Sequence, residues 1–221
     1  MISIIIPVWN KMTQTAECLA HLVPFLEPED QLIVVDNGST DETQMLLEYW
    51  QRIIPEQMDI IRNEENRGFG GANNQGAELA RNPILLWMSN DVIVKGKFQA
   101  SLEMAFQGNR QRVVCGRLVN WPGGWNEFGD LIIPYAEGWF IAVTKQFFEV
   151  VGGFDPQFFP CDYEDVDLSY RAAQAGYELV QGKLPVQHRC GVTATQLENR
   201  LEVTKKHRML FAKKWGLMDA S

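Results

Sequence analysis

Residues 32–43 read LIVVDNGSTDET and join the end of a strand to the start of a helix. The apolar, largely β-branched run before Asp36 is typical of a strand that is covered on both faces. Ser39 and Glu42 stand at capping-box spacing, which predicts a helix that continues to about Trp50. The segment therefore predicts a strand–turn–helix unit with a carboxylate at the end of its strand.

Strands and helices alternate on both sides of this unit. We predict strands at 2–8, 32–36, 58–62 and 84–89, and helices at about 13–26, at 39–50 and from the glycine-rich loop 66–71 to about Arg81. Such alternation implies βαβ units with right-handed crossovers. The predicted fold class is α/β, with a mostly parallel central sheet and helices on both faces. Asp36 and Asp91 fall at the carboxyl ends of their strands, the functional edge of such a sheet.

The second half of the chain is less regular. We predict strands at 112–119 and 138–143, short helices near 144–151 and 164–175, and a long amphipathic helix at about 197–215. No repeat or linker interrupts the sequence, so we expect one domain.

The composition narrows the class of protein. The net charge of −8 disfavours a nucleic-acid binder, because phosphate contacts need a basic excess. The four cysteines contain no CxxC spacing, so a zinc knuckle or a redox dithiol is not expected. No segment reaches the roughly 18 continuous apolar residues of a membrane span, and the N-terminal stretch resembles a buried strand more than a signal peptide. These features predict a cytoplasmic location.

Two segments suit a nucleotide. Asp36 suits a hydrogen bond from a base N–H or a ribose hydroxyl, although Asp36, Asn37 and Ser39 equally suit a turn and a cap. In NRGFGGANNQG (66–76), glycines permit close backbone approach and the following helix offers free N–H groups to an anion. The alternative for this second segment is a plain glycine loop, because it lacks the Rossmann spacing.

Two residues suit a divalent cation. Asp91 ends a buried strand in WMSNDVIV (87–94), where a lone carboxylate is costly, and Mg²⁺ takes one or two carboxylates plus phosphate oxygens and water. His188 in VQHRCG (186–191) suits a Mn²⁺-class ion. The alternatives are a turn cap for Asp91 and a structural or solvated histidine.

Acidic residues crowd a predicted helix start in GGFDPQFFPCDYEDVDLSYR (152–171). They are Asp162, Glu164, Asp165 and Asp167. The helix dipole accounts for one or two acids. Four of them beside aromatic side chains indicate a site in which a carboxylate is held as a base.

Taken in order, these segments resemble the family 2 glycosyltransferases with the GT-A fold, particularly the bacterial rhamnosyltransferase-like branch. The matching segments are SIIIPVWN, LIVVDNGSTDET, NRGFGGANNQG, LLWMSNDVIV, VGGFDPQFFPCDYEDVDLSYRAAQAGY and VQHRCG, which span residues 3–191. The C-terminal RMLFAKKWG also resembles the helix that closes many members. The resemblance implies a nucleotide-binding half (1–95), an acceptor and catalytic half (96–195) and a C-terminal helix (196–221).

The resemblance also implies residue roles. Asp165, in its pair with Glu164, matches the catalytic base, and Asp91 matches the last aspartate of a DxD metal motif. His188 matches a histidine that in some members reaches the metal or diphosphate. The residues implied to lie along the nucleotide-sugar are Pro7, Trp9, Asp36, Asn37, Asn66, Gly68, Asn74, Asn90, Gly138 and Trp139. The sequence departs from the family pattern at Ser89, which stands at the first DxD position, and in the PCDY stretch before Glu164.

The implied reaction is an inverting sugar transfer from a UDP- or dTDP-linked donor to an acceptor hydroxyl, aided by Mn²⁺ or Mg²⁺, in polysaccharide or glycoconjugate assembly. A metal-dependent nucleotidyltransferase and a carbohydrate-binding module remain as alternatives, whereas a glycoside hydrolase would need no nucleotide pocket. The C-terminal helix carries basic residues beside apolar ones and suits either docking on the domain or peripheral contact with an anionic membrane that presents a lipid-linked saccharide. These residues are Lys205, Lys206, Arg208, Lys213 and Lys214, beside Leu210, Phe211 and Trp215.

Overall fold

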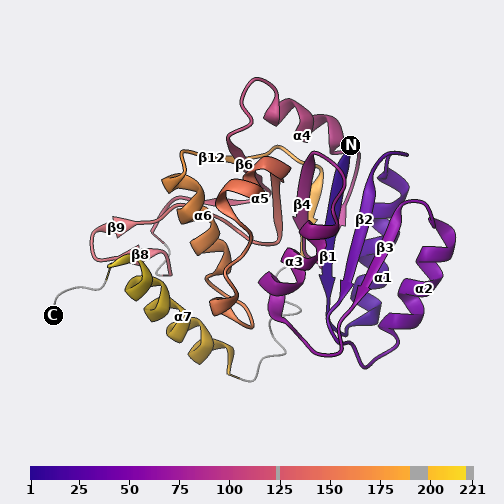
Figure 1. Ribbon diagram of the computed structural model, residues 1–221, viewed down its shortest axis with the longest axis horizontal. Coiled ribbons are helices and arrows are strands. Elements are labelled where there is room, and N and C mark those ends of the chain that lie inside the picture. Colours follow the sequence, from indigo (N-terminus) through magenta and orange to yellow (C-terminus); the bar gives the residue numbers. More distant parts are fainter. Residues whose placement is uncertain (123–124, 190–198, 218–221) are drawn as a thin grey trace.

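The computed structural model describes residues 1–122, 125–189 and 199–217. The strands of its central sheet are β1 (Ile2–Val8), β2 (Gln31–Asp36), β3 (Met58–Arg62), β4 (Ile84–Met88), β6 (Arg112–Cys115), β11 (Phe140–Thr144) and β12 (Glu178–Gln181). They lie in the order β12-β6-β11-β4-β1-β2-β3 (Figure 1). Strand β11 runs antiparallel to both neighbours, whereas the other pairs in this sheet are parallel. The predicted α/β class with a mostly parallel sheet is confirmed.

Helices surround the sheet, as predicted. Their bounds are α1 (Met12–Leu22), α2 (Thr43–Ile53), α3 (Gly68–Leu79), α4 (Gln99–Phe106), α5 (Lys145–Val151), α6 (Glu164–Gln174) and α7 (Arg200–Trp215), with the 3₁₀ turns η1 (Val23–Phe25) and η2 (Pro156–Phe158). Short strands pair outside the main sheet: β5 (Val92–Val94) with β13 (Val186–His188), β7 (Leu118–Val119) with β10 (Tyr135–Ala136), and β8 (Glu127–Phe128) with β9 (Leu131–Ile132).

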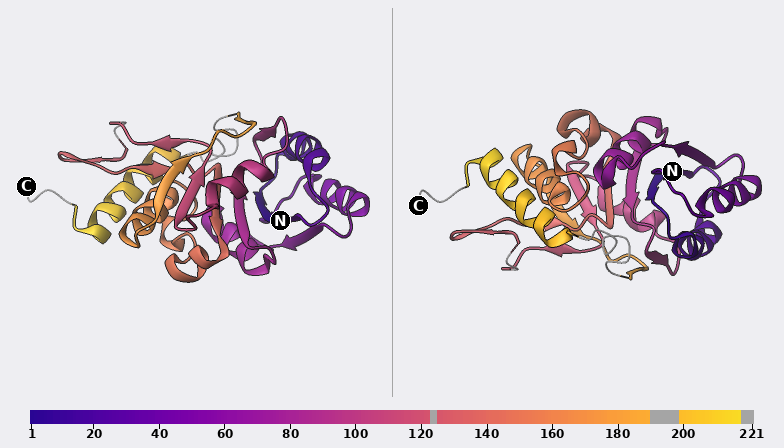
Figure 2. Two further views of the ribbon diagram at one scale, coloured as in Figure 1. Left: turned by 90° about the horizontal axis from the view of Figure 1, so that it is seen from above. Right: turned by 90° about the horizontal axis from the view of Figure 1, so that it is seen from below.

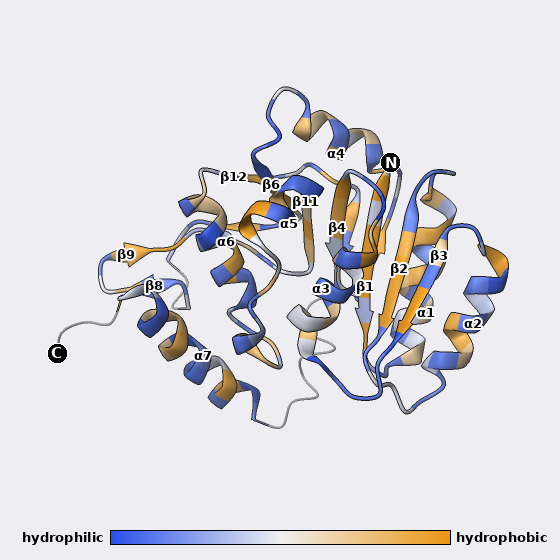
Figure 3. Ribbon diagram, in the orientation of Figure 1, coloured by the Kyte–Doolittle hydropathy of each residue, from blue (hydrophilic) through white to orange (hydrophobic). Residues whose placement is uncertain are grey.

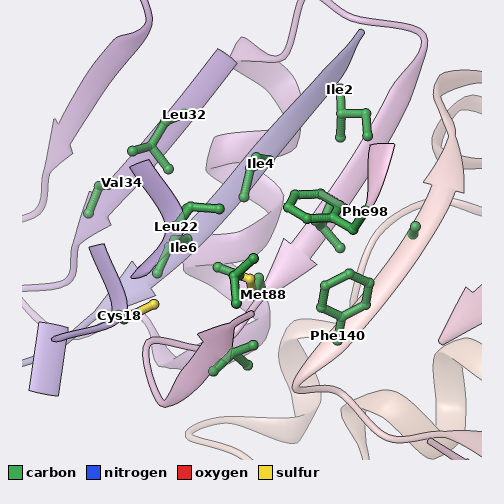
Figure 4. Close-up of a cluster of buried hydrophobic side chains, with 14 of the residues drawn as sticks. Ile2, Ile4, Ile6, Cys18, Leu22, Leu32, Val34, Met88, Phe98 and Phe140 are labelled. Carbon is green, nitrogen blue, oxygen red and sulfur yellow. The ribbon is translucent and has the colours of Figure 1, made fainter. Parts of the chain in front are cut away.

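Strand β1 contributes to two cores, because successive side chains of a strand point to opposite faces of the sheet. Ile4 and Ile6 pack with side chains from α1, α2 and α4. Figure 4 shows Cys18 and Leu22 of α1 in this cluster. Ile5 packs on the other face with side chains from α3, α5 and α6. This burial on both faces explains why the central strands are almost uniformly apolar (Figure 3).

Helix α3 packs very closely against β1. A Cβ atom built on Gly76 would lie 2.3 Å from Cγ2 of Ile5, so a glycine is required at this position. Asn74, on the same helix, binds the backbone of Phe154: its side chain donates to the carbonyl and accepts from the N–H, both at 2.8 Å. These contacts fix α3 between β1 and the segment that leads to α6.

The turns after β1 and β2 hold each other in place. The N–H of Asn10 donates to Oγ of Ser39 at 2.8 Å. The predicted capping box is therefore wrong: Ser39 bonds across to the other turn, and Glu42 makes no side-chain cap. Asp41 instead accepts from the N–H of Thr43 at 3.1 Å, and α2 begins there. The polar run after β2 thus links two turns at the carboxyl edge of the sheet.

Several predicted boundaries differ from the structure. The helix predicted at 13–26 ends at Leu22 and continues as η1, and the helix predicted after 66–71 already begins at Gly68 and ends at Leu79. The single strand predicted at 112–119 is divided, because the chain bends at Gly116 and β7 leaves the sheet to pair with β10. The strands predicted at 84–89 and 138–143 span 84–88 and 140–144.

Helix α7 lies beside α6, at the end of the molecule away from β3 (Figures 1 and 2). The simple amphipathic pattern predicted for it is wrong, because Leu201 and Met209 are exposed while Lys214 points inward to the fully buried Asp167. The predicted residues 197–198 of this helix lie outside the described residues. Along the described parts of the chain, no helix has both the length and the apolar character needed to cross a bilayer.

Candidate active site

A cleft of about 770 Å³ lies where β1, β2 and β4 end, and the first residues of α6 and α7 form its opposite wall. Asp91 and Asp165 both line it, although they come from different halves of the sequence. The sequence-predicted residues that line the cleft are Pro7, Trp9, Asn37, Asn66, Asn90, Asp91, Gly138, Trp139, Glu164, Asp165 and His188. The cleft therefore lies at the carboxyl edge of the sheet, which the sequence predicted to be the functional edge.

Three predicted residues are not part of this lining. Asp36 is buried at the end of β2, where one carboxylate oxygen accepts from the N–H of Ser39 and the other has no hydrogen-bond partner among the described residues. Gly68 has a φ of 75° and faces Pro160, whose carbonyl would lie 2.9 Å from an added Cβ. Asn74 is occupied by the backbone of Phe154.

Asn37 and Asn66 form one rigid side of the cleft. The amide of Asn37 donates to Oδ1 of Asn66 at 2.8 Å, and the same oxygen accepts from the N–H of Gly68 at 2.8 Å. Oδ1 of Asn37 accepts from the N–H of Arg67 and from the side chain of Asn63, both at 3.0 Å. The loop before α3 is thus held onto the end of β2 by amide side chains.

Asp91 and His188 lie side by side in the cleft. Nε2 of His188 is 3.2 Å from Oδ1 of Asp91, and the side chains are 20% and 3% exposed. Burial works against ionisation of Asp91, yet the hydrogen bond and charge of His188, helped by Ser89, hold the pKa of Asp91 below its usual range. The ring of His188 stacks on Trp139 with centroids 4.8 Å apart and planes 9° from parallel.

The donor set fits a partly open cation site. Within the described residues, no three His, Cys, Asp or Glu side chains gather as a complete ligand set. Asp91 and His188 offer one carboxylate and one imidazole on the cleft wall. Mn²⁺ and Mg²⁺ accept few protein ligands when substrate phosphates and water fill the remaining positions. The two residues therefore suit a metal that arrives with a phosphate-bearing ligand.

Glu164 and Asp165 begin α6 and face the cleft. Oδ2 of Asp165 accepts from the N–H of Gly138 at 3.0 Å, and Oδ1 accepts from the N–H of Val166 at 2.8 Å. Burial raises the pKa of Asp165 above that of an ordinary aspartate despite these two hydrogen bonds. Burial, followed by the charge of Asp165, raises the pKa of Glu164 well above its usual range. The pair is suited to taking up a proton.

The four crowded acids divide into two groups. Asp167 is fully buried against Arg171 and Lys214 and has a structural role. Asp162 lines the cleft and pairs with Arg200, at 2.9 and 3.1 Å. Of these four acids, only Glu164 and Asp165 remain suited to accept a proton.

The sequence did not reveal several residues of the cleft wall. They include Arg117, Tyr135, Glu137, Arg200 and Thr204. The polar start of α7 was a weak signal, because polar residues at a helix start usually face water. The left-handed backbone at Asp162 and Tyr163, with φ values of 70° and 75°, leaves no mark in the sequence.

Comparison with known proteins agrees with this geometry. The sequence profile of glycosyl transferase family 2 matches residues 3–164, which is well over half of the chain. The chain belongs to glycosyl transferase family 2. That assignment makes it a member of a family of transferase enzymes and confirms the family resemblance, whereas the rhamnosyltransferase-like branch is not confirmed.

Individual relatives fit the same family. An uncharacterized glycosyltransferase of Bacillus subtilis, YfnE, is 33% identical over 115 residues, which cover 52% of this chain and 29% of that protein. The glycosyltransferase GlyG of Streptococcus pneumoniae is 25% identical over 121 residues, covering 55% of this chain and 40% of that protein. The match thus spans less than half the length of either relative.

A solved structure has the same fold. The mannosyltransferase PcManGT of Pyrobaculum calidifontis, in complex with GDP-Man and Mn²⁺, superposes with a TM-score of 0.70 at 17% identity. The match covers 96% of this chain and 64% of that protein. The predicted GT-A fold is therefore confirmed.

Proposed function

We propose that this protein transfers a sugar from a nucleotide diphosphate donor to an acceptor hydroxyl with inversion at the anomeric carbon. The observation that carries the proposal is that Asp91 and Asp165 line one cleft, in environments that shift their pKa values in opposite directions. Asp91 has a lowered pKa and stays charged, whereas Asp165 has a raised pKa and suits proton transfer. The family match and its nucleotide-sugar-bound structural neighbour support the same reaction class.

The diphosphate of the donor belongs, in this proposal, beside Asp91 and His188. These two residues would hold a Mn²⁺ or Mg²⁺ ion, which when bound stabilises the negative charge that develops on the departing diphosphate. Pro7, Trp9 and Asn37 would border the nucleotide at the ends of β1 and β2. One buried oxygen of Asp36 has no hydrogen-bond partner in the part of the chain that the structure describes, which supports a role for this residue beneath the base.

Asp165 would act as the base. The acceptor oxygen forms a bond to the anomeric carbon while the bond from that carbon to the diphosphate oxygen breaks, and the hydroxyl proton passes to Asp165. The N–H groups of Gly138 and Val166 fix the direction of the carboxylate. Glu164 remains next to it as a buried acid with a raised pKa, so the pair favours a single shared negative charge.

We infer a UDP- or dTDP-linked hexose, rhamnose included, as donor, and a saccharide or lipid-linked saccharide in polysaccharide or glycoconjugate assembly as acceptor. Exposed residues of α7 support contact with the cytoplasmic face of an anionic membrane: Lys205, Lys206 and Lys213 are exposed beside Leu201 and Met209. In this proposal the whole described chain serves as one catalytic domain.

Thermal shift with UDP, dTDP and GDP, each with and without Mn²⁺, tests donor binding without knowledge of the acceptor. We expect one nucleotide to raise Tm, and to do so mainly in the presence of Mn²⁺. The matching nucleotide-sugar should then release nucleoside diphosphate on turnover. The Asp165→Asn variant should retain the thermal shift and lose roughly 10²- to 10⁴-fold in turnover. Absence of any nucleotide response, or full turnover in this variant, would end the proposal.

A further inference from the structure

The side chain of Trp139 lies between two other parts of the cleft wall. Its indole N–H donates to Oε2 of Glu137 at 2.9 Å, and its backbone carbonyl accepts from the N–H of Ser89 at 2.9 Å. Glu137 is in turn 3.4 Å from the guanidinium of Arg117. Trp139 is therefore held through its backbone carbonyl and through its indole nitrogen, and the orientation of the indole is fixed.

The position of the indole depends on a glycine. A Cβ atom built on Gly116 would lie 2.2 Å from Cη2 of Trp139 and below 3.0 Å from two further ring carbons. No side chain fits there unless Trp139 moves. The bend that ends β6 at Gly116 therefore leaves room for the six-membered ring of the indole.

The same indole carries the imidazole of His188. The two rings are stacked, with centroids 4.8 Å apart and planes 9° from parallel, and Nε2 of His188 is directed to Oδ1 of Asp91 at 3.2 Å. His188 ends β13, whose pairing with β5 sets its backbone next to the segment after Asp91. The strand pairing fixes the position of the His188 backbone. The flat contact with the indole of Trp139 fixes the rotation of the imidazole ring.

We propose that Trp139 is a positioning residue that holds His188 in the orientation needed to join Asp91 as a cation ligand. This inference rests on the proposed function, because it gives the pair a metal to hold. In this proposal the indole of Trp139 stacks on the imidazole of His188 and makes no direct stacking contact with the donor sugar. Hydrogen-bonded partners that orient a metal-binding histidine typically contribute about 10- to 100-fold in metal affinity, and we expect an effect of the same order from the stacked indole.

The first experiment reads the ring contact alone. In the full chain labelled at its three histidines, we expect the ring protons of His188 to be shifted upfield by the indole. Trp139→Ala should remove that shift, and so should Gly116→Ala, because its Cβ displaces the indole. Trp139→Phe retains an aromatic face and should keep most of the shift. The matched control is Gly96→Ala, whose Cβ would lie at an ordinary 3.5 Å from Pro185.

The second experiment measures Mn²⁺ affinity of the same variants by electron paramagnetic resonance of the free ion, with UDP present. Trp139→Ala and Gly116→Ala should weaken binding about 10- to 100-fold, while Trp139→Phe and the control stay near the wild type. An unchanged affinity in Trp139→Ala, or an unshifted His188 in the wild type, would overturn the positioning role. Failure of the wild type itself to bind Mn²⁺ would instead contradict the proposed metal dependence, and the two failures are therefore distinguishable.

Discussion

Nζ of Lys214 lies 2.6 Å from Oδ1 of Asp167 and joins the last turn of α7 to the first turns of α6. Asp167 is fully buried and also binds Arg171 at 2.8 Å. Asp167→Ala would leave both cations without this carboxylate, so we expect the free energy of unfolding to fall by about 3–5 kcal/mol in chemical denaturation. Glu149 is exposed, so Glu149→Ala serves as control and should change the free energy of unfolding by less than about 0.5 kcal/mol. Equal stability of the two variants would contradict the structural role.

Asp91→Ala should uncouple nucleotide binding from the metal. In the wild type we expect Mn²⁺ to tighten UDP binding by about tenfold or more, a typical coupling between two ligands, measured by titration calorimetry. In the variant, affinity with and without Mn²⁺ should be the same, because the charged ligand is gone. Asp130 is exposed and does not line the cleft, so Asp130→Ala should behave as the wild type. A tightening by Mn²⁺ that survives in Asp91→Ala would remove this residue from the cation site.

The raised pKa of Asp165 predicts the acidic side of the pH–rate profile. The base must be ionised to accept a proton, and burial raises its pKa above the ordinary value of about 3.9. We therefore expect kcat to fall on acidification with a midpoint above pH 4. The measurement is nucleoside diphosphate release from saturating donor between pH 4 and 8. A rate that is still maximal at pH 4 would contradict Asp165 as the base.

Glu164→Gln should stabilise the fold increasingly as pH rises. The pKa of Glu164 is higher in the folded chain than in the unfolded chain, so the folded state binds more protons above the unfolded value of about 4.3. The contribution of this group to stability therefore decreases as pH rises from that value through the folded pKa. Each unit of pKa difference is worth about 1.4 kcal/mol. Denaturation at pH 4 and pH 8 checks this, and a gain that is largest at pH 4 would have the wrong sign.

Arg200 should affect turnover more than donor binding. It pairs with Asp162, where the backbone adopts a left-handed conformation immediately before the helix that carries Asp165. Arg200→Ala should let this segment relax and lower kcat about 10- to 100-fold, since small misplacements of reacting groups are costly. Calorimetry should find UDP affinity unchanged. A variant with normal kcat and weakened UDP binding would assign Arg200 to the donor instead.

Much of the regular half of the fold was predictable, because both faces of β1, β2 and β4 are buried. The apolar run at 2–8 matches β1 residue by residue, and 58–62 matches β3. The second half of the fold was harder to predict, because several of its strands are only two or three residues long and pair outside the main sheet. Tyr135 and Ala136, for example, pair with β7, and two residues give no readable period.

Predictions within the site depended on where polar side chains form their bonds. Asp91 and Asp165 lie in the cleft because Asp91 follows the end of β4 and Asp165 stands at the start of α6, and both ends border the cleft. Asn74 looked equally suitable, yet its amide is bound to the backbone of Phe154, far away in sequence. The support of His188 by Trp139 and Gly116 likewise depends on three segments meeting. A local motif carries no information about such partners.

The antiparallel pairing of β11 with β4 has a mechanical consequence. Five consecutive residue pairs, from Phe140 with Met88 to Thr144 with Ile84, join the two halves of the chain into one sheet beneath the cleft. A hinge between the halves would have to tear this ladder, so we expect the floor to stay rigid during turnover. Adaptation to an incoming ligand then falls to the rim, where the first turns of α7 contribute Arg200, Leu201 and Thr204 to the cleft wall.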